Sequence, residues 1–238
     1  MAYTSYKGPS VLDGNPIVAL ITGIDRPSAN PKTGIMLHQW IVREDMDPLV
    51  ASKTGADASI CGNCAFRAKE GKERSCYVTL MHGPLQAYKG MLKSADPLQA
   101  KHLRGEIIRL GAYGDPAAIP LDYIEWMARH AAGVLGFTHQ WKNCDQGLAK
   151  YCMASCETPE DHALAKEKGW RTFRVKLPEA PRLPGERPCP SAAEAGDNGV
   201  TCRKCMQCDG HNTGKSRDFV IDVHGTGRKH FMAALSRK

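Results

Sequence analysis

Residues 107–141 decide the fold class, and they read IIRLGAYGDPAAIPLDYIEWMARHAAGVLGFTHQW. The apolar run 107–110 predicts a strand that ends at the turn residues 111–116. A helix is expected over residues 121–131, because apolar residues recur there at three- and four-residue spacing. Residues 134–137 again predict a strand. A strand, a helix and a second strand in this order indicate a parallel sheet built from βαβ units.

The same alternation extends outward along the chain. Strands are expected at residues 17–22, 36–42, 151–154, 170–175 and 219–223, and a helix from Thr158 to Gly169. Residues 44–64 are expected to form a loop, and Asp96-Pro97-Leu98-Gln99 predicts the start of a helix. The predicted fold class is α/β, with a parallel-stranded, partial β/α barrel-like core and a small cysteine-rich, metal-binding C-terminal module.

Five prolines between residues 177 and 190 predict an extended linker. We therefore expect two parts. Residues 1–177 form the barrel-like core with a first group of cysteines, and residues 178–238 form the linker and the cysteine-rich module.

Composition excludes several classes of protein. The chain has 238 residues, of which 42% are hydrophobic and 24% are charged, so it can bury a sizeable core. No apolar run approaches the ~18 residues that a membrane helix needs, and residues 1–7 do not resemble a secretion signal. A cytoplasmic protein without a membrane partner is expected. The phosphate loop, dinucleotide-binding, zinc-protease and serine-hydrolase motifs are absent, which disfavours those enzyme classes.

The chain contains ten cysteines, and seven of them fall into two groups. The first group is Cys61, Cys64 and Cys76; the second is Cys189, Cys202, Cys205 and Cys208. In a reducing compartment such clusters indicate metal binding rather than disulfides. The second group is a complete four-thiolate set that suits either a [4Fe–4S] cluster or zinc. The first group either borrows a fourth ligand (Cys144, Cys152, Cys156, His82 or His38) or leaves one position open.

Polar residues follow the predicted strands, at the edge where parallel α/β proteins collect their chemistry. Asp115 could accept a hydrogen bond from a ligand amine or cap the following helix. His139 could act as a base or a ligand, or satisfy a structural contact. Gln140 and Ser155 occupy comparable positions. Arg171 and Arg174 suit an anion or a carboxylate, although a solvated edge is the interpretation we favour.

Several stretches carry a resemblance to a known family. Residues 109–120 (RLGAYGDPAAIP), 136–141 (GFTHQW), 153–155 (MAS) and 169–175 (GWRTFRV), with the module from Cys189-Pro190 to Cys208, resemble a bacteriophage-encoded cysteine-rich family. The resemblance covers about residues 15 to 225. It implies a location in the cytoplasm of the host.

A remoter similarity is to radical S-adenosylmethionine (SAM) enzymes. A cysteine group after an early strand, and a strand ending in Gly114-Asp115-Pro116, are similar to their partial barrel and its Gly-Glu-Pro-like turn. The resemblance implies an iron–sulfur cluster and SAM as cofactors. It also implies Asp115 and His139 as catalytic residues, with Gly114, Asp115, Pro116, Gln140 and Ser155 lining the cofactor site. The family's C-x3-C-x2-C motif is missing here.

Three functions are therefore expected to compete. The first is a metalloprotein, radical-SAM-like or a degenerate relative, that acts on a nucleotide, a nucleic acid or a peptide. The second is a metal-stabilised nucleic-acid-binding protein. Residues 203–238 contain eight basic and three acidic side chains, and Lys204, Lys215, Arg217, Arg228 and Lys229 could contact phosphates. The third is an accessory protein that binds a host protein.

Overall fold

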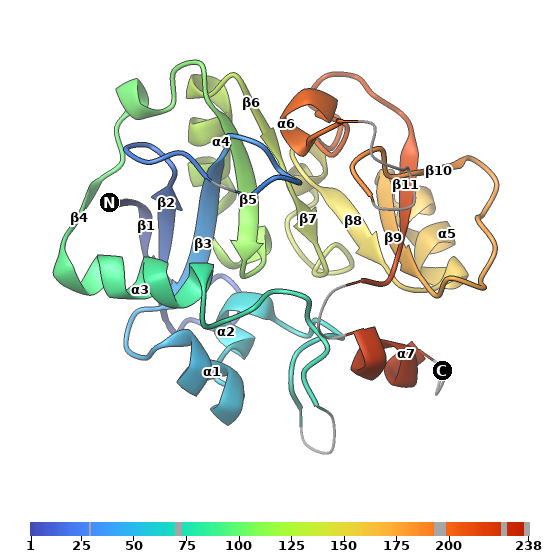
Figure 1. Ribbon diagram of the computed structural model, residues 1–238, viewed down its shortest axis with the longest axis horizontal. Coiled ribbons are helices and arrows are strands. Elements are labelled where there is room, and N and C mark those ends of the chain that lie inside the picture. The colour runs from blue at the N-terminus through green and yellow to red at the C-terminus, as the bar shows by residue number, and fades with distance from the viewer. Residues whose placement is uncertain (29, 70–72, 193–198, 225–227, 236–238) are drawn as a thin grey trace.

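The computed structural model describes residues 1–238 apart from 29, 70–72, 193–198, 225–227 and 236–238. It is a mixed α/β protein with two sheets side by side (Figure 1). The first sheet has the order β4 (Ala95–Pro97), β1 (Ala2–Pro9), β2 (Pro16–Thr22), β3 (Leu37–Arg43), β5 (Ile107–Tyr113) and β6 (Gly133–Leu135). The second has the order β10 (Glu186–Pro188), β11 (Asp218–Asp222), β9 (Thr172–Lys176), β8 (Met153–Cys156) and β7 (Phe137–Thr138).

Strand direction separates the two halves of the molecule. The strands β1, β2 and β3 pair antiparallel, whereas β3, β5 and β6 pair in parallel. All the pairings in the second sheet are parallel. The expected α/β class with parallel strands is thus confirmed. The alternation of strands and helices in the sequence predicted parallel pairing, and it did not predict the antiparallel meander β1–β3.

One glycine lies where the chain passes from the first sheet to the second. Gly136 separates β6 from β7, its N–H donates to Cys208 O (3.0 Å), and its carbonyl accepts from Met153 N (3.0 Å). A Cβ at this position would lie 2.9 Å from Leu110 Cβ and 3.0 Å from Cys152 Sγ. Any larger residue would therefore force the two sheets apart here.

Helices connect and cover the sheets. The helices α1 (Pro48–Thr54), α2 (Ala58–Cys61) and α3 (Gly83–Lys93) pack against the strands β1–β3. The helices α4 (Leu121–His130) and α5 (Pro159–Glu167) make the two predicted crossovers, β5 to β6 and β8 to β9. The short α6 (Cys202–Cys205) and the C-terminal α7 (Arg228–Leu235) follow. Three further turns are 3₁₀-helical: Ala100–His102, Pro116–Ala118 and Gln146–Lys150.

Two local expectations were wrong. Residues 95–97 form the edge strand β4 rather than a helix start, since the edge of β1 is open to them and Leu98 N donates to Thr4 O (2.8 Å). Residues 44–64 contain α1 and α2 rather than a loop. Asp47 caps the start of α1 by accepting hydrogen bonds from Leu49 N and Val50 N. The helix was not predicted because it is too short to show a periodic apolar pattern.

The boundary expected at residue 177 lies inside one hydrogen-bonded unit. Both β10 and β11 pair with the second sheet, so residues 178–238 contribute two strands to it. The linker runs outward from β9 and returns as β10. The C-terminal cysteines are consequently attached to the same sheet as His139 and Ser155.

Candidate functional site

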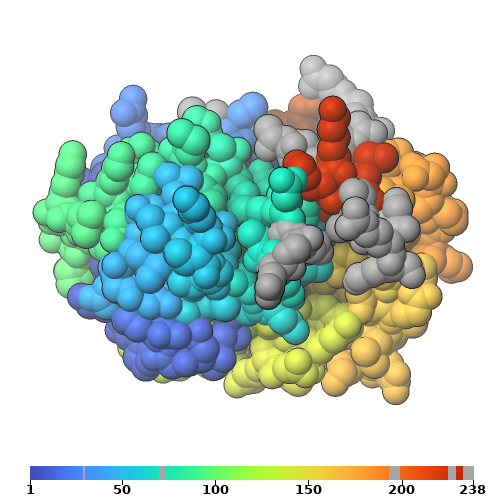
Figure 2. Space-filling model, turned by 90° about the horizontal axis from the view of Figure 1, so that it is seen from below, coloured from blue at the N-terminus to red at the C-terminus, as the bar shows by residue number. Residues whose placement is uncertain are grey.

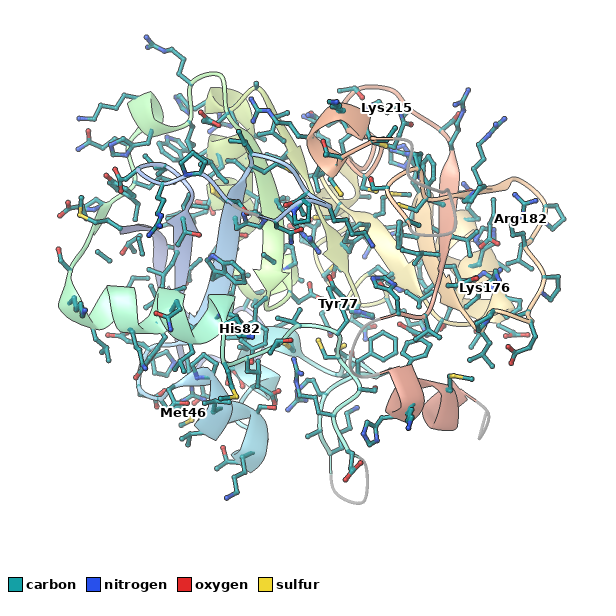
Figure 3. All side chains as sticks on the ribbon, viewed as in Figure 1. Met46, Tyr77, His82, Lys176, Arg182 and Lys215 are labelled. Carbon is teal, nitrogen blue, oxygen red and sulfur yellow. The ribbon has the colours of Figure 1, made fainter. Side chains whose placement is uncertain are left out.

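A cavity of about 340 Å³ lies between the two sheets, and all seven cysteines of the two predicted groups line it. Gly114, Asp115, His139 and Ser155 line it as well. Tyr77, another lining residue, is exposed and stands near the middle of the view in Figure 3. We call this space the cysteine cavity. Two segments more than a hundred residues apart in sequence thus line one cavity.

The two groups enter the cysteine cavity from opposite ends. In Figure 1, α2 with Cys61 lies at the lower end, where β5 ends, and α6 with Cys202 and Cys205 lies at the upper end. The first group therefore occupies the carboxyl edge of the parallel strands, where the predicted site residues also collect. The second group reaches the cavity from the other side.

A buried ion pair holds the loop of the first group. Cys61 ends α2, and Gly62 turns the chain with a positive φ of 56°. Arg67 lies 2.7 Å from Asp57 Oδ1 and donates to Gly62 O (2.6 Å) and Gly55 O (2.7 Å). Because the guanidinium binds both sides of the turn, the C-x-x-C loop has a fixed shape.

Cys76 returns to the first group through the backbone. Ser75 N and Cys76 N both donate to Phe66 O, at 3.1 and 3.0 Å. The Phe66 ring in turn packs on Phe231 of α7, with centroids 4.6 Å apart, and Figure 2 shows α7 beside this loop. The C-terminal helix thus covers the outer side of the first cysteine group.

The thiols of the first group are close enough to influence one another. Burial raises the pKa of Cys61 well above its ordinary value, and the neighbouring Cys64 and Cys76 raise it further. Burial also raises the pKa of Cys76. Buried thiols without a bound cation hold their protons, whereas a metal would displace them.

His139 is the histidine beside the first group. Its Nδ1 lies 2.9 Å from Glu157 Oε1, and Phe66 meets the ring edge-to-face with centroids 5.1 Å apart. Burial lowers the pKa of His139, but Cys64 and then Glu157 outweigh it, so the pKa is well above the ordinary value. A carboxylate behind an imidazole is the arrangement that orients histidine toward a metal or a proton acceptor.

The five residues that the sequence offered as a fourth ligand do not line the cysteine cavity. They are Cys144, Cys152, Cys156, His82 and His38. His139, which was expected to be catalytic, is the candidate that the fold brings to the first group. The available signal was its place directly after a parallel strand, at the same edge as Asp115.

Asp115 adopts the capping role. Its Oδ1 accepts from Ala117 N (3.0 Å) and Thr138 Oγ1 (2.7 Å), and its Oδ2 accepts from His139 N (2.7 Å). Burial raises its pKa, although these hydrogen bonds act in the opposite direction. The carboxylate ties the end of β5 to the end of β7 and so positions His139.

The remaining predicted site residues shape the turns. Gly114 has a φ of 80°, and a Cβ there would lie 2.6 Å from Ile41 Cβ. Pro116 begins the 3₁₀ turn and does not line the cavity. Gln140 does not line it either; its Nε2 donates to Cys61 O (3.0 Å), and its Oε1 accepts from Asn63 N (3.4 Å). Gln140 thus supports the C-x-x-C loop from behind.

The second group is built from β10 and the α6 region. Cys189 follows β10 and donates its N–H to Val220 O (2.9 Å), and Thr201 caps α6. Burial raises the pKa of Cys208 well above the ordinary value, and the other three cysteines of the group add to this. All four thiols therefore interact around one part of the cavity.

Two buried arginines anchor this region, so the solvated edge that we favoured for them was wrong. Arg171 is fully buried and lies 3.1 Å from Asp209 Oδ1, while it also donates to the carbonyls of Gln207, Gly210 and Arg217. Arg174 lies 2.6 Å from Glu186 Oε1. Both arginines bind carboxylates, which is the other expectation stated for them.

Arg109 faces the second group from β5. Its Nη2 donates to Tyr77 Oη (2.8 Å). Tyr77, followed by Cys202 and Cys208, raises the pKa of Arg109, although burial opposes this. A permanent positive charge therefore lies on the wall of the cavity opposite these two thiols.

The basic C-terminal segment is partly occupied by internal contacts. Lys215 donates to Met206 O and lies 3.1 Å from Asp209, and Arg203 lies 3.7 Å from Glu106. Arg217 and Lys229 are exposed. The side chain of Arg228 lies outside the described residues.

In the part of the chain that the structure describes, no three His, Cys, Asp or Glu side chains converge tightly enough to hold one metal ion. None of the described helices is long and apolar enough to cross a membrane. Comparison of the chain with models of protein families, with curated proteins and with solved structures found no match.

Proposed function

We propose that this chain is an iron–sulfur protein. Its parallel strands form a partial β/α barrel-like core, and the C-terminal cysteines form a metal-binding module. The observation that carries the proposal is the cysteine cavity, which is lined by three cysteines at one end and four at the other. Each group would hold one cluster. Ten unpaired thiols suit a reducing compartment, so we place the protein in the cytoplasm, that of the host for a phage-encoded chain.

The sequence spacing of the second group supports a cluster over zinc. Cys202, Cys205 and Cys208 recur at every third position, and Cys189-Pro190 supplies a fourth thiol before a proline, as in ferredoxin runs. All seven thiols of the two groups line one cavity of about 340 Å³. A four-iron cluster is a larger body held by sulfurs at its corners.

Charge supports the second cluster site. A cluster held by four thiolates is anionic, so it requires nearby cations in a buried setting. Arg109 lines the same cavity as Cys202 and Cys208, which raise its pKa. Burial raises the pKa of Cys189 and of Cys205, and Lys32 and Lys215, respectively, act in the opposite direction. These cations would stabilise both the thiolate ligands and the cluster.

The first group would leave one iron without a cysteine. Such a cluster, once bound and reduced by an external one-electron donor, would supply an electron to a ligand at its open iron. His139, oriented by Glu157, would hold or receive a proton beside that position. Gly114 and Ser155 would line the space for SAM, and Asp115 would fix the turn between them. The spacing of Cys61, Cys64 and Cys76 differs from that of the radical SAM motif, so SAM binding is tested on its own.

Anaerobically reconstituted protein tests the proposal through its visible absorbance. The double variants Cys61→Ser/Cys64→Ser and Cys202→Ser/Cys205→Ser are each expected to lose about half of the cluster absorbance. Cys144→Ser is the matched control, because Cys144 does not line the cavity, and should lose none. A change in spectrum on adding SAM should disappear only in the first double variant. A colourless protein, or equal loss in all three variants, would contradict the proposal.

A second candidate is a nucleic-acid-binding protein without catalysis. It is supported by the exposed Arg217 and Lys229 in a segment of net charge +5 (eight basic minus three acidic residues, 203–238). Its affinity for nucleic acid should fall steeply with salt. Salt-independent binding, or none at low salt, would exclude this candidate and leave host-protein binding as the non-catalytic alternative.

A further inference from the structure

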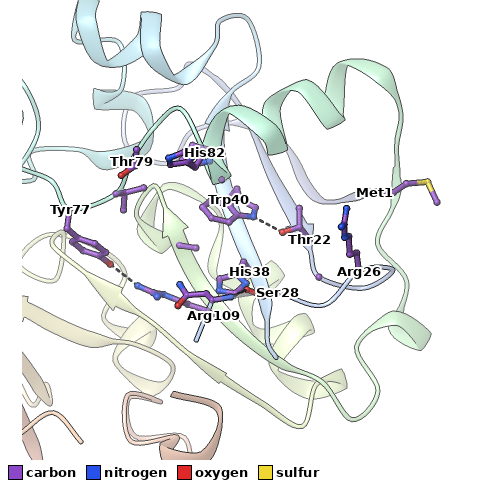
Figure 4. Close-up of a pocket in the computed structure, with 16 residues that line it drawn as sticks. Met1, Thr22, Arg26, Ser28, His38, Trp40, Tyr77, Thr79, His82 and Arg109 are labelled. Carbon is purple, nitrogen blue, oxygen red and sulfur yellow. Dashed lines mark hydrogen bonds between the residues drawn. The ribbon is translucent and has the colours of Figure 1, made fainter. Parts of the chain in front are cut away.

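A second pocket, of about 470 Å³, opens on the other side of Tyr77 and Arg109. We call it the Trp40 pocket. Arg109 and Tyr77 lie on one side of it and Arg26 on the other, with Trp40 and His38 between them (Figure 4). It shares Tyr77 and Arg109 with the cysteine cavity, so a ligand here would lie against the wall of that cavity.

The polar lining of the Trp40 pocket selects for negative charge. Arg26 and Arg109 supply two permanent cations, and among the described residues that line the pocket none is acidic. Arg26 is exposed and has no carboxylate within ion-pair distance in the described part of the chain. The nearest acid, Asp25, is taken by the N-terminal amine (3.3 Å) and by Tyr3 Oη (3.0 Å). An anionic ligand at Arg26 would therefore meet a positive charge that no described carboxylate compensates, whereas Arg109 is shared with the cysteine cavity.

The aromatic lining is rigid. Trp40 Nε1 donates to Thr22 Oγ1 (2.8 Å), and the His38 ring stacks with the Trp40 ring at 5.8 Å and 24°. Gly83 lies against the edge of the indole, where any Cβ would collide with it. Burial and then Arg109 lower the pKa of His38 to about 4, so this imidazole is neutral at pH 7, and its Nε2 lies 3.5 Å from Thr33 Oγ1. Fixed rings beside cations suit a flat heterocycle joined to an anion.

We infer that the Trp40 pocket binds a nucleoside phosphate, with its base beside Trp40 and its phosphate at Arg26. The volume lies within the range of about 300–1,000 Å³ that small-molecule sites occupy. This inference goes beyond the proposed function and does not require a cluster to be present, because none of the seven cysteines lines this pocket.

Isothermal titration of the full-length protein tests the inference. The ligands are AMP, GMP, CMP and UMP, and at least one is expected to bind with a Kd below about 1 mM. The nucleoside without phosphate, ribose 5-phosphate without the base, and inorganic phosphate should each bind about tenfold more weakly or worse. Inorganic phosphate or ribose 5-phosphate binding as tightly as the best nucleotide would overturn the assignment of a base site.

Two arginine variants locate the binding. Arg26→Gln should weaken the best nucleotide about tenfold, since it removes a charged contact to phosphate. Arg129→Gln is the matched control: its side chain is 64% exposed, lies on α4 and does not line the pocket, so affinity should not change. Equal affinity of Arg26→Gln and the unaltered protein would overturn the inference. So would the failure of all four nucleotides to bind.

The test separates this inference from the cluster proposal and from nucleic-acid binding. Nucleotide affinity should be the same before and after cluster reconstitution, so a protein without iron can still confirm the Trp40 pocket. A short single-stranded oligonucleotide should bind no tighter than the best mononucleotide through this pocket. An oligonucleotide that binds more tightly and loses affinity in Arg26→Gln would show that the occupant is a nucleic acid, and would overturn the assignment to a small ligand.

Discussion

Replacing Arg171 with methionine should loosen the contact of residues 207–217 with the second sheet. The Arg171 side chain is fully buried, and its N–H groups reach the carbonyls of Gln207, Gly210 and Arg217 as well as Asp209. Methionine fills similar space but donates no hydrogen bond. The segment 207–217 would then lose its ion pair to Arg171, the residue next to β9.

The magnitude follows from the burial of both partners. The side chains of Arg171 and Asp209 are 0% and 1% exposed, and removing one partner of such a pair costs about 3–5 kcal/mol. Asp209 keeps contacts to Thr213 Oγ1 (2.5 Å) and Lys215 (3.1 Å), which places the expected loss near the lower end, at about 3 kcal/mol.

Urea unfolding and native-state hydrogen exchange measure the two consequences. Arg174→Met is the matched control, since Arg174 is also buried and paired, to Glu186 on β10. Both variants should lose stability, but only Arg171→Met should speed exchange over residues 202–217, because Arg174 is paired to β10 and not to that segment. A loss below about 1 kcal/mol in Arg171→Met would refute this account of the anchor, as would equal exchange in the two variants.

Three further outcomes are expected. His38 has a pKa of about 4 in the folded protein against 6.5 for a free imidazole, so stability should fall by up to about 3 kcal/mol as pH drops from 6.5 to 4. His38→Gln should lose less stability than the unaltered protein between these pH values, as measured by unfolding at pH 7 and pH 4.5. An equal loss of stability in the two proteins would contradict this. Asp115→Ala should lower the free energy of unfolding by about 2 kcal/mol, because Thr138 Oγ1 and His139 N lose their acceptor. The urea midpoint measures this loss, and an unchanged midpoint argues against a structural cap. Gly114→Ala should lower the free energy of unfolding by about 3 kcal/mol through backbone strain and contact with Ile41. Gly105 has a φ of 76° but open space around it, so Gly105→Ala should lower it by only about 1 kcal/mol. Equal thermal shifts in the two variants would exclude the steric contribution.

Much of the parallel half of the fold was predictable, because buried strands leave a continuous apolar run. The strands β5, β8, β9 and β11 were all expected within a few residues of their bounds. The helices and strands that were not predicted lack such an apolar run. The helix α3 buries only Pro84 and Ala87, so its apolar face is too narrow to show periodicity, and β10 has three residues.

The site was predictable in its members but not in its arrangement. Spacing alone identified the seven cysteines that line the cysteine cavity. Spacing carries no information on which residues face them across the fold. The contribution of Arg109 depends on β5 passing between the two groups, and the role of Arg171 depends on a loop forty residues later returning to its side chain.

The ratio of iron and acid-labile sulfide to protein chain, measured on anaerobically purified and reconstituted material, tests the central claim most directly. Two four-iron clusters predict about eight iron and eight sulfide ions per chain, and half of each after Cys202→Ser/Cys205→Ser. One or two zinc ions per chain with no sulfide would contradict the claim, and so would a chain that takes up neither metal while remaining folded.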